Sequence, residues 1–133
     1  MMQNRVYLGG NAIGRLLIVD GEVNNRSPLA RALRLEGYTV EEAGSAHETL
    51  TLLKLVPYDL MVLDINLPGM SGVEVMRHVR RLHPELIIII LTGHFSTENA
   101  QEVLGLKAAD YLCKPVSLSE ISQAVIKALR QRS

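Results

Sequence analysis

The stretch Leu86-Ile87-Ile88-Ile89-Ile90-Leu91-Thr92 decides the fold class of this chain. It is rich in β-branched side chains and apolar at both odd and even positions, which is typical of a strand buried on both faces of a parallel sheet. Two further apolar runs, residues 15–20 and 58–64, repeat this plan, and each ends in a carboxylate. The more mixed runs 39–43 and 109–113 carry charge, as strands nearer a sheet edge do. The sequence therefore predicts five strands.

Polar residues indicate where the helices between these runs begin. Ser45 is followed three residues later by Glu48, and Ser117 by Glu120, which is the spacing of a capping box at a helix N-terminus. Ser27-Pro28 would place a cap residue before a proline at the first helical position. Strand and helix thus alternate five times with short connections. This order predicts an α/β domain in which helices cover both faces of a five-stranded parallel sheet.

Length and composition limit the classes of protein to consider. The 133 residues fit one domain, and 14 basic against 14 acidic residues provide no bulk attraction to nucleic acid or anionic lipid. One cysteine excludes an intramolecular disulfide, and the longest apolar run, residues 86–91, is far shorter than the ~20 residues of a membrane span. We expect a cytoplasmic domain over residues 15–131, without direct nucleic-acid or membrane contact, after a flexible lead-in over residues 1–14.

Polar residues also stand where the predicted strands end. Asp20 ends the first strand, Asp64 the third and Thr92 the fourth, and Lys114 follows the fifth. The carboxyl ends of parallel strands meet at one edge of the sheet, where such folds bind ligands. Each residue alone is more commonly a turn or loop residue. Together, two carboxylates, a hydroxyl and an ammonium at one edge favour a divalent cation beside a phosphoryl group.

Four segments carry a resemblance to a known family. They are Leu17-Ile18-Val19-Asp20, residues 64–72 (Asp-Ile-Asn-Leu-Pro-Gly-Met-Ser-Gly), Leu91-Thr92-Gly93 and Tyr111-Leu112-Cys113-Lys114-Pro115. At these separations they resemble the receiver domain of bacterial two-component response regulators, including the single-domain chemotaxis type. The resemblance covers about residues 15–131. It implies a flavodoxin-like, doubly wound sheet with strand order 2-1-3-4-5, and a signalling domain that is not an enzyme.

The resemblance also implies roles for individual residues. Asp64 would take a phosphoryl group from a sensor histidine kinase, a phosphotransfer protein or a small phosphodonor. A carboxylate is already ionised near pH 7, so it can attack phosphorus directly. Mg²⁺ would be the cofactor, bound by Asp20, Asp64 and the backbone carbonyl of Asn66.

Three further residues would respond to the phosphoryl group. By resemblance, Thr92 would hydrogen-bond one phosphoryl oxygen and Lys114 would pair with another. Tyr111 matches the aromatic residue that changes rotamer when Thr92 moves. The resemblance also implies a cis peptide bond between Lys114 and Pro115. Output would pass to a downstream protein or output domain through the surface of the fourth helix, fifth strand and fifth helix.

The sequence departs from the family pattern at Gly21. Most receivers carry a second acid there that binds Mg²⁺ directly, whereas glycine offers no side-chain oxygen. Asp20 or Glu22 could cover the gap, water could fill it, or metal binding could be weakened, and the sequence leaves these alternatives open. Glu22 is therefore included as a metal ligand candidate.

Two functions follow from these observations. The first is a phosphorylation-dependent signalling switch, and the alternative is a phosphorylation-independent interaction module whose weakened metal site reflects Gly21. A phosphatase on a similar sheet is disfavoured because Asn66 stands where a general acid would be needed. The chain ends at Ser133 directly after the last predicted helix, so we expect no output domain within it.

Two smaller features are interpreted as structural. The third predicted helix carries five basic or imidazole side chains and is interpreted as a solvated face: Arg77, His78, Arg80, Arg81 and His83. Cys113 is expected to be a small buried apolar residue.

Overall fold

The computed structural model describes residues 13–132, which form five strands and five helices. The strands are β1 (Arg15–Val19), β2 (Thr39–Ala43), β3 (Leu60–Asp64), β4 (Ile87–Thr92) and β5 (Asp110–Cys113). The helices are α1 (Val23–Leu35), α2 (Ala46–Leu55), α3 (Gly72–Leu82), α4 (Thr97–Gly105) and α5 (Leu118–Arg130). All neighbouring strands are parallel in the order β2-β1-β3-β4-β5, which confirms the flavodoxin-like prediction. The lead-in predicted over residues 1–14 lies outside the described residues except for Ile13 and Gly14.

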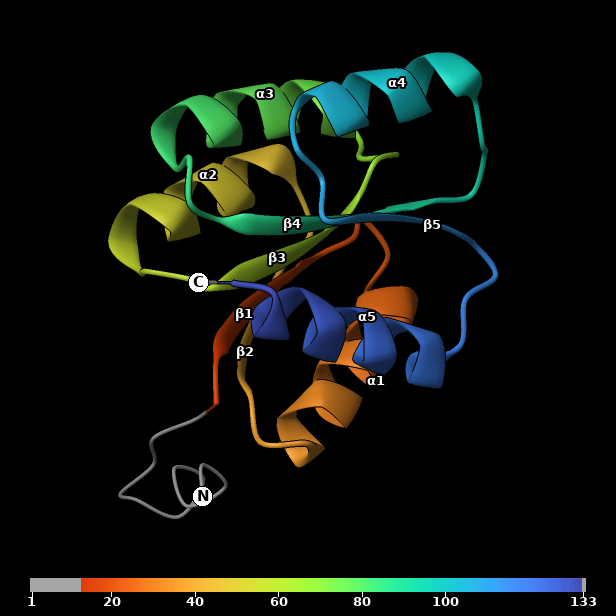
Figure 1. Ribbon diagram of the computed structural model, residues 1–133. Coiled ribbons are helices and arrows are strands. Elements are labelled where there is room, and N and C mark those ends of the chain that lie inside the picture. The colour runs from red at the N-terminus through yellow and green to blue at the C-terminus, as the bar shows by residue number, and fades with distance from the viewer. Residues whose placement is uncertain (1–12, 133) are drawn as a thin grey trace.

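The apolar strands form the centre of the sheet and separate two layers of helices. The side chains Leu60 to Leu63 of β3 and Ile88 to Ile90 of β4 are fully buried. One cluster of buried side chains joins the sheet to α2, α3 and α4, and a second joins it to α1 and α5. Figure 1 shows these two groups of helices on opposite faces of the sheet. Because both faces are covered, the strands are apolar at odd and even positions alike.

Serine caps begin four of the helices, and two of these caps, Ser45 and Ser117, are the ones that the sequence predicts. The hydroxyl oxygens of Ser45, Ser71, Ser96 and Ser117 each accept a hydrogen bond from the backbone N–H three residues later. Only Ser117 forms the reciprocal capping box, because the Glu120 carboxylate also accepts from the Ser117 N–H. Hydrogen bonding from Ser117 to this carboxylate, chiefly from the backbone N–H, lowers the pKa of Glu120.

The start predicted for the first helix at Ser27-Pro28 is wrong. Helix α1 begins five residues earlier, at Val23, because the carbonyl of Glu22 accepts from the N–H groups of Asn25 and Arg26 and closes the first turn. Pro28 is therefore inside the helix, where its missing N–H removes a single backbone hydrogen bond.

The solvated basic face predicted for α3 also needs correction. Arg80 is half-buried, and its guanidinium donates to the carbonyls of Leu86 at 2.7 Å and Leu106 at 2.8 Å. It also donates to the carbonyls of His83, Pro84 and Lys107. Burial lowers the pKa of the guanidinium. Arg80 thus ties the ends of α3 and α4 to the start of β4.

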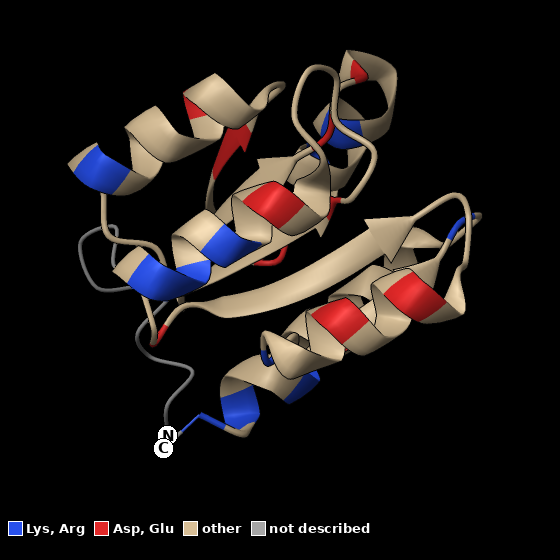
Figure 2. Ribbon diagram, turned by 90° about the horizontal axis from the view of Figure 1, so that it is seen from above, with Lys and Arg blue, Asp and Glu red and all other residues tan. Residues whose placement is uncertain are grey.

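Charge does not concentrate on one face of the domain. Figure 2 shows basic and acidic residues interspersed along the helices, in keeping with the balanced composition. None of the helices between residues 13 and 132 combines the length and hydropathy that crossing a membrane requires.

Candidate functional site

Two carboxylates meet where β1 and β3 end. The register of these strands pairs Val19 with Leu63, so the residues that follow, Asp20 and Asp64, are neighbours at the carboxyl edge of the sheet. Their exposed fractions are only 5% and 6%. Two carboxylates this close and this buried require a compensating cation, because burial and mutual repulsion both disfavour the ionised form.

Lys114 supplies that cation from the residue after β5. Its Nζ donates to Asp20 Oδ2 at 3.0 Å and to Asp64 Oδ2 at 2.9 Å. Burial on its own lowers the pKa of the Lys114 ammonium, but hydrogen bonds and charge from Asp64 and Asp20 outweigh it and raise the pKa above its ordinary value. The lysine therefore stays charged and bridges the two acids.

Backbone N–H groups hold the remaining oxygen of each carboxylate. Asp20 Oδ1 accepts from the N–H of Glu22 at 2.9 Å, and Asp64 Oδ1 accepts from the N–H of Asn66 at 2.9 Å. These are Asx turns, in which a side chain binds the backbone two residues ahead. Both carboxylates are thus fixed in orientation before any ligand arrives.

The two acids and Lys114 line a hollow of about 700 Å³ at the carboxyl edge. Its other walls come from the residues after β1 and from the loop between β3 and α3: Gly21, Glu22, Asn25, Ile65, Asn66, Leu67, Pro68, Gly69, Met70 and Ser71. Carboxylate, carbonyl and water oxygens are the ligands that Mg²⁺ prefers. Two carboxylates against one ammonium leave a net negative charge in a hollow open to water, so this donor set fits a magnesium ion.

Glu22 lines the hollow but is not joined to the acid pair. Its side chain is exposed, and Oε1 accepts from Asn25 Nδ2 at 2.8 Å. Within residues 13–132, no three His, Cys, Asp or Glu side chains are grouped so that they could hold a metal together. Gly21 packs closely against Pro68 in the wall of the hollow and adds no side-chain oxygen.

Thr92 is fully buried at the end of β4, and its hydroxyl is engaged locally. Thr92 Oγ1 donates to the His94 carbonyl at 2.8 Å and accepts from the His94 N–H at 3.1 Å. Its own carbonyl accepts from the Lys114 N–H at 2.7 Å, which ties the ends of β4 and β5 together. The structure therefore brings Thr92 to the same edge as the acids without a direct contact to them.

Tyr111 packs beside an aromatic residue that the sequence did not single out. The ring centroids of Tyr111 and Phe95 are 5.7 Å apart, and the Phe95 side chain is 62% exposed. The Tyr111 hydroxyl is buried and has no hydrogen-bond partner among the described residues. The sequence signal for Phe95 was only its position as a single aromatic residue three positions after Thr92.

One expectation in this region is confirmed and one is wrong. The peptide bond between Lys114 and Pro115 is cis. Cys113, expected to be buried, is exposed. It ends β5, which is the edge strand of the sheet, so no further strand covers it.

Comparison with known proteins agrees with this fold. The family model of the response regulator receiver domain matches residues 16–126. The regulatory protein AtoC of Escherichia coli K12 is 34% identical over 122 residues, covering 92% of this chain and 26% of that protein. The response regulator MprA of Mycolicibacterium vanbaalenii is 37% identical over 119 residues, covering 90% of this chain and 51% of that protein.

Solved structures of receiver domains have the same fold as this chain. A CheY-like receiver domain protein from Methanospirillum hungatei superposes with a TM-score of 0.86 at 32% identity, covering 89% of this chain and 94% of that one. The chain belongs to the receiver domain family of two-component response regulators, which are signalling domains. It spans about a quarter to a half of the length of the two curated relatives named above.

Proposed function

We propose that this chain is a phosphorylation-dependent switch in which Asp64 receives a phosphoryl group with the help of Mg²⁺. The observation that carries the proposal is the state of Asp64: it is almost fully buried, oriented by Asn66 and Lys114, and set in the wall of an open hollow. The donor would be a sensor histidine kinase, a phosphotransfer protein or a small molecule such as acetyl phosphate.

Asp64 is the nucleophile of the reaction. One of its carboxylate oxygens forms a bond to phosphorus as the bond from phosphorus to the donor breaks, and the product is an acyl phosphate. Lys114 then exchanges its contact with Asp64 for one with a phosphoryl oxygen, because its ammonium already lies 2.9 Å from that carboxylate. Asp20, Asp64 and the Asn66 carbonyl would hold Mg²⁺, which when bound supplies positive charge opposite the phosphoryl oxygens.

The change at Asp64 would reach the surface through Thr92 and Tyr111. Phosphorylation adds roughly −1.5 to −2 charge. The Thr92 hydroxyl would leave the backbone of His94 to bind a phosphoryl oxygen, and Tyr111, whose buried hydroxyl is unpaired, would change rotamer. Partners that recognise the α4, β5 and α5 surface would respond to this rearrangement.

One observation supports a second candidate, a phosphorylation-independent interaction module. Lys114 bridges Asp20 and Asp64, so the chain itself already balances part of their negative charge. Gly21 adds no ligand that would favour metal over this bridge.

Intact-protein mass spectrometry after incubation with acetyl phosphate tests the proposal. We expect one added phosphoryl group in the presence of Mg²⁺, its loss with a chelator, and its absence in Asp64→Asn. An unmodified wild-type chain in the presence of saturating Mg²⁺ would favour the interaction module. A mass shift that persists in Asp64→Asn would show that another residue is the acceptor.

A further inference from the structure

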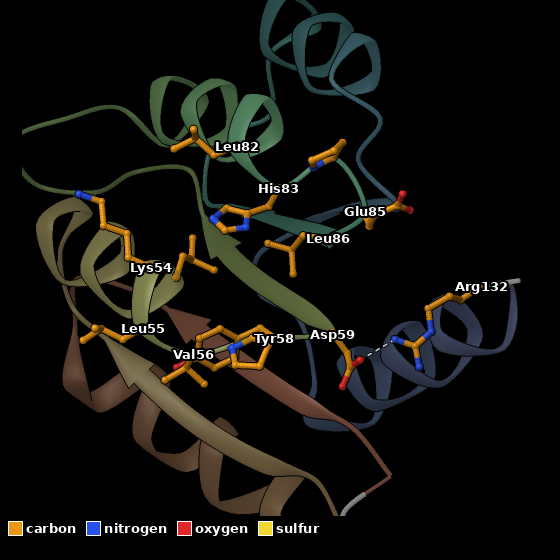
Figure 3. Close-up of a pocket in the computed structure, with 13 residues that line it drawn as sticks. Lys54, Leu55, Val56, Tyr58, Asp59, Leu82, His83, Glu85, Leu86 and Arg132 are labelled. Atoms are coloured by element: carbon orange, nitrogen blue, oxygen red, sulfur yellow. Dashed lines mark hydrogen bonds and ion pairs between the residues drawn. The ribbon is translucent and has the colours of Figure 1, made fainter.

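A second hollow lies at the amino edge of the sheet, opposite the acid pair. It measures about 660 Å³ and is called here the amino-edge groove. Figure 3 shows it between the C-terminal ends of α2 and α3 and the segments that lead into β3 and β4. Its lining is mostly apolar and includes Leu55, Leu82 and Leu86, and Asp59, Glu85 and Arg132 are among its charged residues.

The rim of the amino-edge groove exposes large apolar side chains. Leu55 and Leu82, the last residues of α2 and α3, are 73% and 60% exposed. They belong to the two helices that border the groove in Figure 3. An apolar hollow whose rim carries exposed leucines is typical of a surface that another segment covers.

The N-terminal part of this chain enters the domain at the same rim. Asp59, which lines the groove, accepts from the Arg15 N–H at 2.8 Å through Oδ2 and donates its own N–H to the Arg15 carbonyl at 2.8 Å. Arg132 reaches the same carboxylate, with Nη1 2.7 Å from Oδ1. The described chain therefore begins, at Ile13, two residues before Arg15, whose backbone is hydrogen-bonded to Asp59 of the groove wall.

The composition of that segment suits the groove. It contains the apolar triplet Val6-Tyr7-Leu8, no acidic residue, and Gly9-Gly10, which permit a sharp turn between the triplet and β1. Tyr7 and Ile13 are six positions apart, so the triplet can reach roughly 20 Å from the rim. Arg5 precedes the triplet, and Glu85 at the groove has no ion-pair partner within residues 13–132.

We propose that Val6-Tyr7-Leu8 of the same chain docks in the amino-edge groove and covers Leu55 and Leu82, with Arg5 beside Glu85. Covering two exposed leucines removes apolar area from water, and the short connection keeps the local concentration of the segment high. The groove is at the opposite edge from Asp64. Docking therefore fixes how the chain enters the domain, and it does not depend on the proposed phosphorylation.

Paramagnetic broadening in the full-length chain tests this proposal. Cys113→Ser removes the exposed native thiol, and Gln3→Cys provides a site for a nitroxide label. The methyl resonances of Leu55 and Leu82 should lose most of their intensity. Those of Leu118, at the start of α5 and 48% exposed, serve as the control and should keep theirs.

Two comparisons make the result decisive. Tyr7→Ser in the labelled chain should restore the Leu55 and Leu82 signals, because the triplet loses its largest apolar side chain. A mixture of labelled chains without isotopes and isotope-enriched chains without label should show no broadening. Broadening in that mixture would assign the groove to a second copy and overturn the proposal. So would full intensity at Leu55 and Leu82 in the singly labelled chain, or broadening that Tyr7→Ser does not remove.

Discussion

Pro68 occupies the space where a side chain at position 21 would begin. A Cβ atom on Gly21 would lie 2.8 Å from Pro68 Cδ and 3.4 Å from Pro68 Cγ, and the first distance is well inside van der Waals contact. The φ angle of Gly21 is not the cause, because the glycines with positive φ in the described chain are Gly37 and Gly69. Close packing of the loop after β3, and not backbone conformation, is what requires glycine here.

Gly21→Asp should therefore change metal binding and stability in opposite directions. The added carboxylate brings a third anion to the hollow, so we expect tighter Mg²⁺ binding by calorimetric titration. Displacing Pro68 should lower the free energy of unfolding by about 1–3 kcal/mol in urea, as overpacking does. Combining it with Pro68→Ala, which removes the colliding ring atoms, should recover part of that loss. Equal losses in the single and double variants would contradict the role of Pro68.

Glu22→Gln separates the two sources of a third ligand. Because the Glu22 carboxylate is exposed and accepts from Asn25, its loss should leave the affinity for Mg²⁺ unchanged within error. A clear drop in affinity in the same titration would show that Glu22 turns towards the metal, and that Gly21 is compensated.

Lys114→Ala should destabilise the domain and increase its response to Mg²⁺. Removing the ammonium leaves two buried carboxylates facing each other. The Lys114 side chain is 26% exposed, so we expect a loss of about 1–3 kcal/mol, below the ~3–5 kcal/mol of fully buried pairs. Saturating Mg²⁺ should raise the melting temperature more in Lys114→Ala than in the wild type, because no ammonium competes for the acids. Lys127→Ala, on the exposed side of α5, is the matched control. An unchanged melting temperature would show that the bridge contributes no stability.

Gly72→Ala should be costly although alanine is the better helix former. A Cβ on Gly72, the first residue of α3, would lie 2.7 Å from the carbonyl oxygen of Ile65 and 2.8 Å from the carbonyl carbon of Ile65. These are backbone atoms, which cannot easily move aside. We expect a loss of at least about 1–3 kcal/mol in urea unfolding. Gly105→Ala at the end of α4 meets no atom within 4 Å and should gain up to ~1 kcal/mol. Similar effects at both positions would contradict this account.

Alkaline pH should destabilise the domain through buried tyrosines. Burial, reinforced by the nearby negative charge of Glu41, raises the pKa of Tyr58 above its ordinary value, and burial does the same for Tyr38. The folded chain keeps these protons where the unfolded chain releases them, so their contribution to stability is complete below about pH 10 and is lost as the pH rises further.

Tyr58→Phe tests this pH dependence. The Tyr58 hydroxyl is buried with no hydrogen-bond partner among the described residues, so its removal should cost little at neutral pH. Denaturant midpoints measured from pH 8 to pH 11 should fall less steeply in Tyr58→Phe than in the wild type. Parallel curves for the two proteins would show that Tyr58 does not contribute.

Local patterns in the sequence determined the strands and helices and the edge of the sheet that carries the candidate site residues. Short runs that are apolar at both odd and even positions predicted the strands, and Ser45 and Ser117 predicted two helix starts. Both signals are visible in the sequence because periodicity and capping act over a few residues. Asp20 and Asp64 followed as residues of one sheet edge once the strands were taken as parallel. The cis bond at Pro115 came from family resemblance alone.

Tertiary structure alone decided which side chains meet. Lys114 bridges acids 94 and 50 residues earlier in the chain, and Arg80 donates to carbonyls in the segments that follow α3 and α4. Pro68 fills the space beside Gly21, and the edge position of β5 exposes Cys113. Such contacts depend on strand register, helix packing and rotamers across the whole chain. Short-range periodicity records which face of an element is buried, but it carries no information about the partner on the other side.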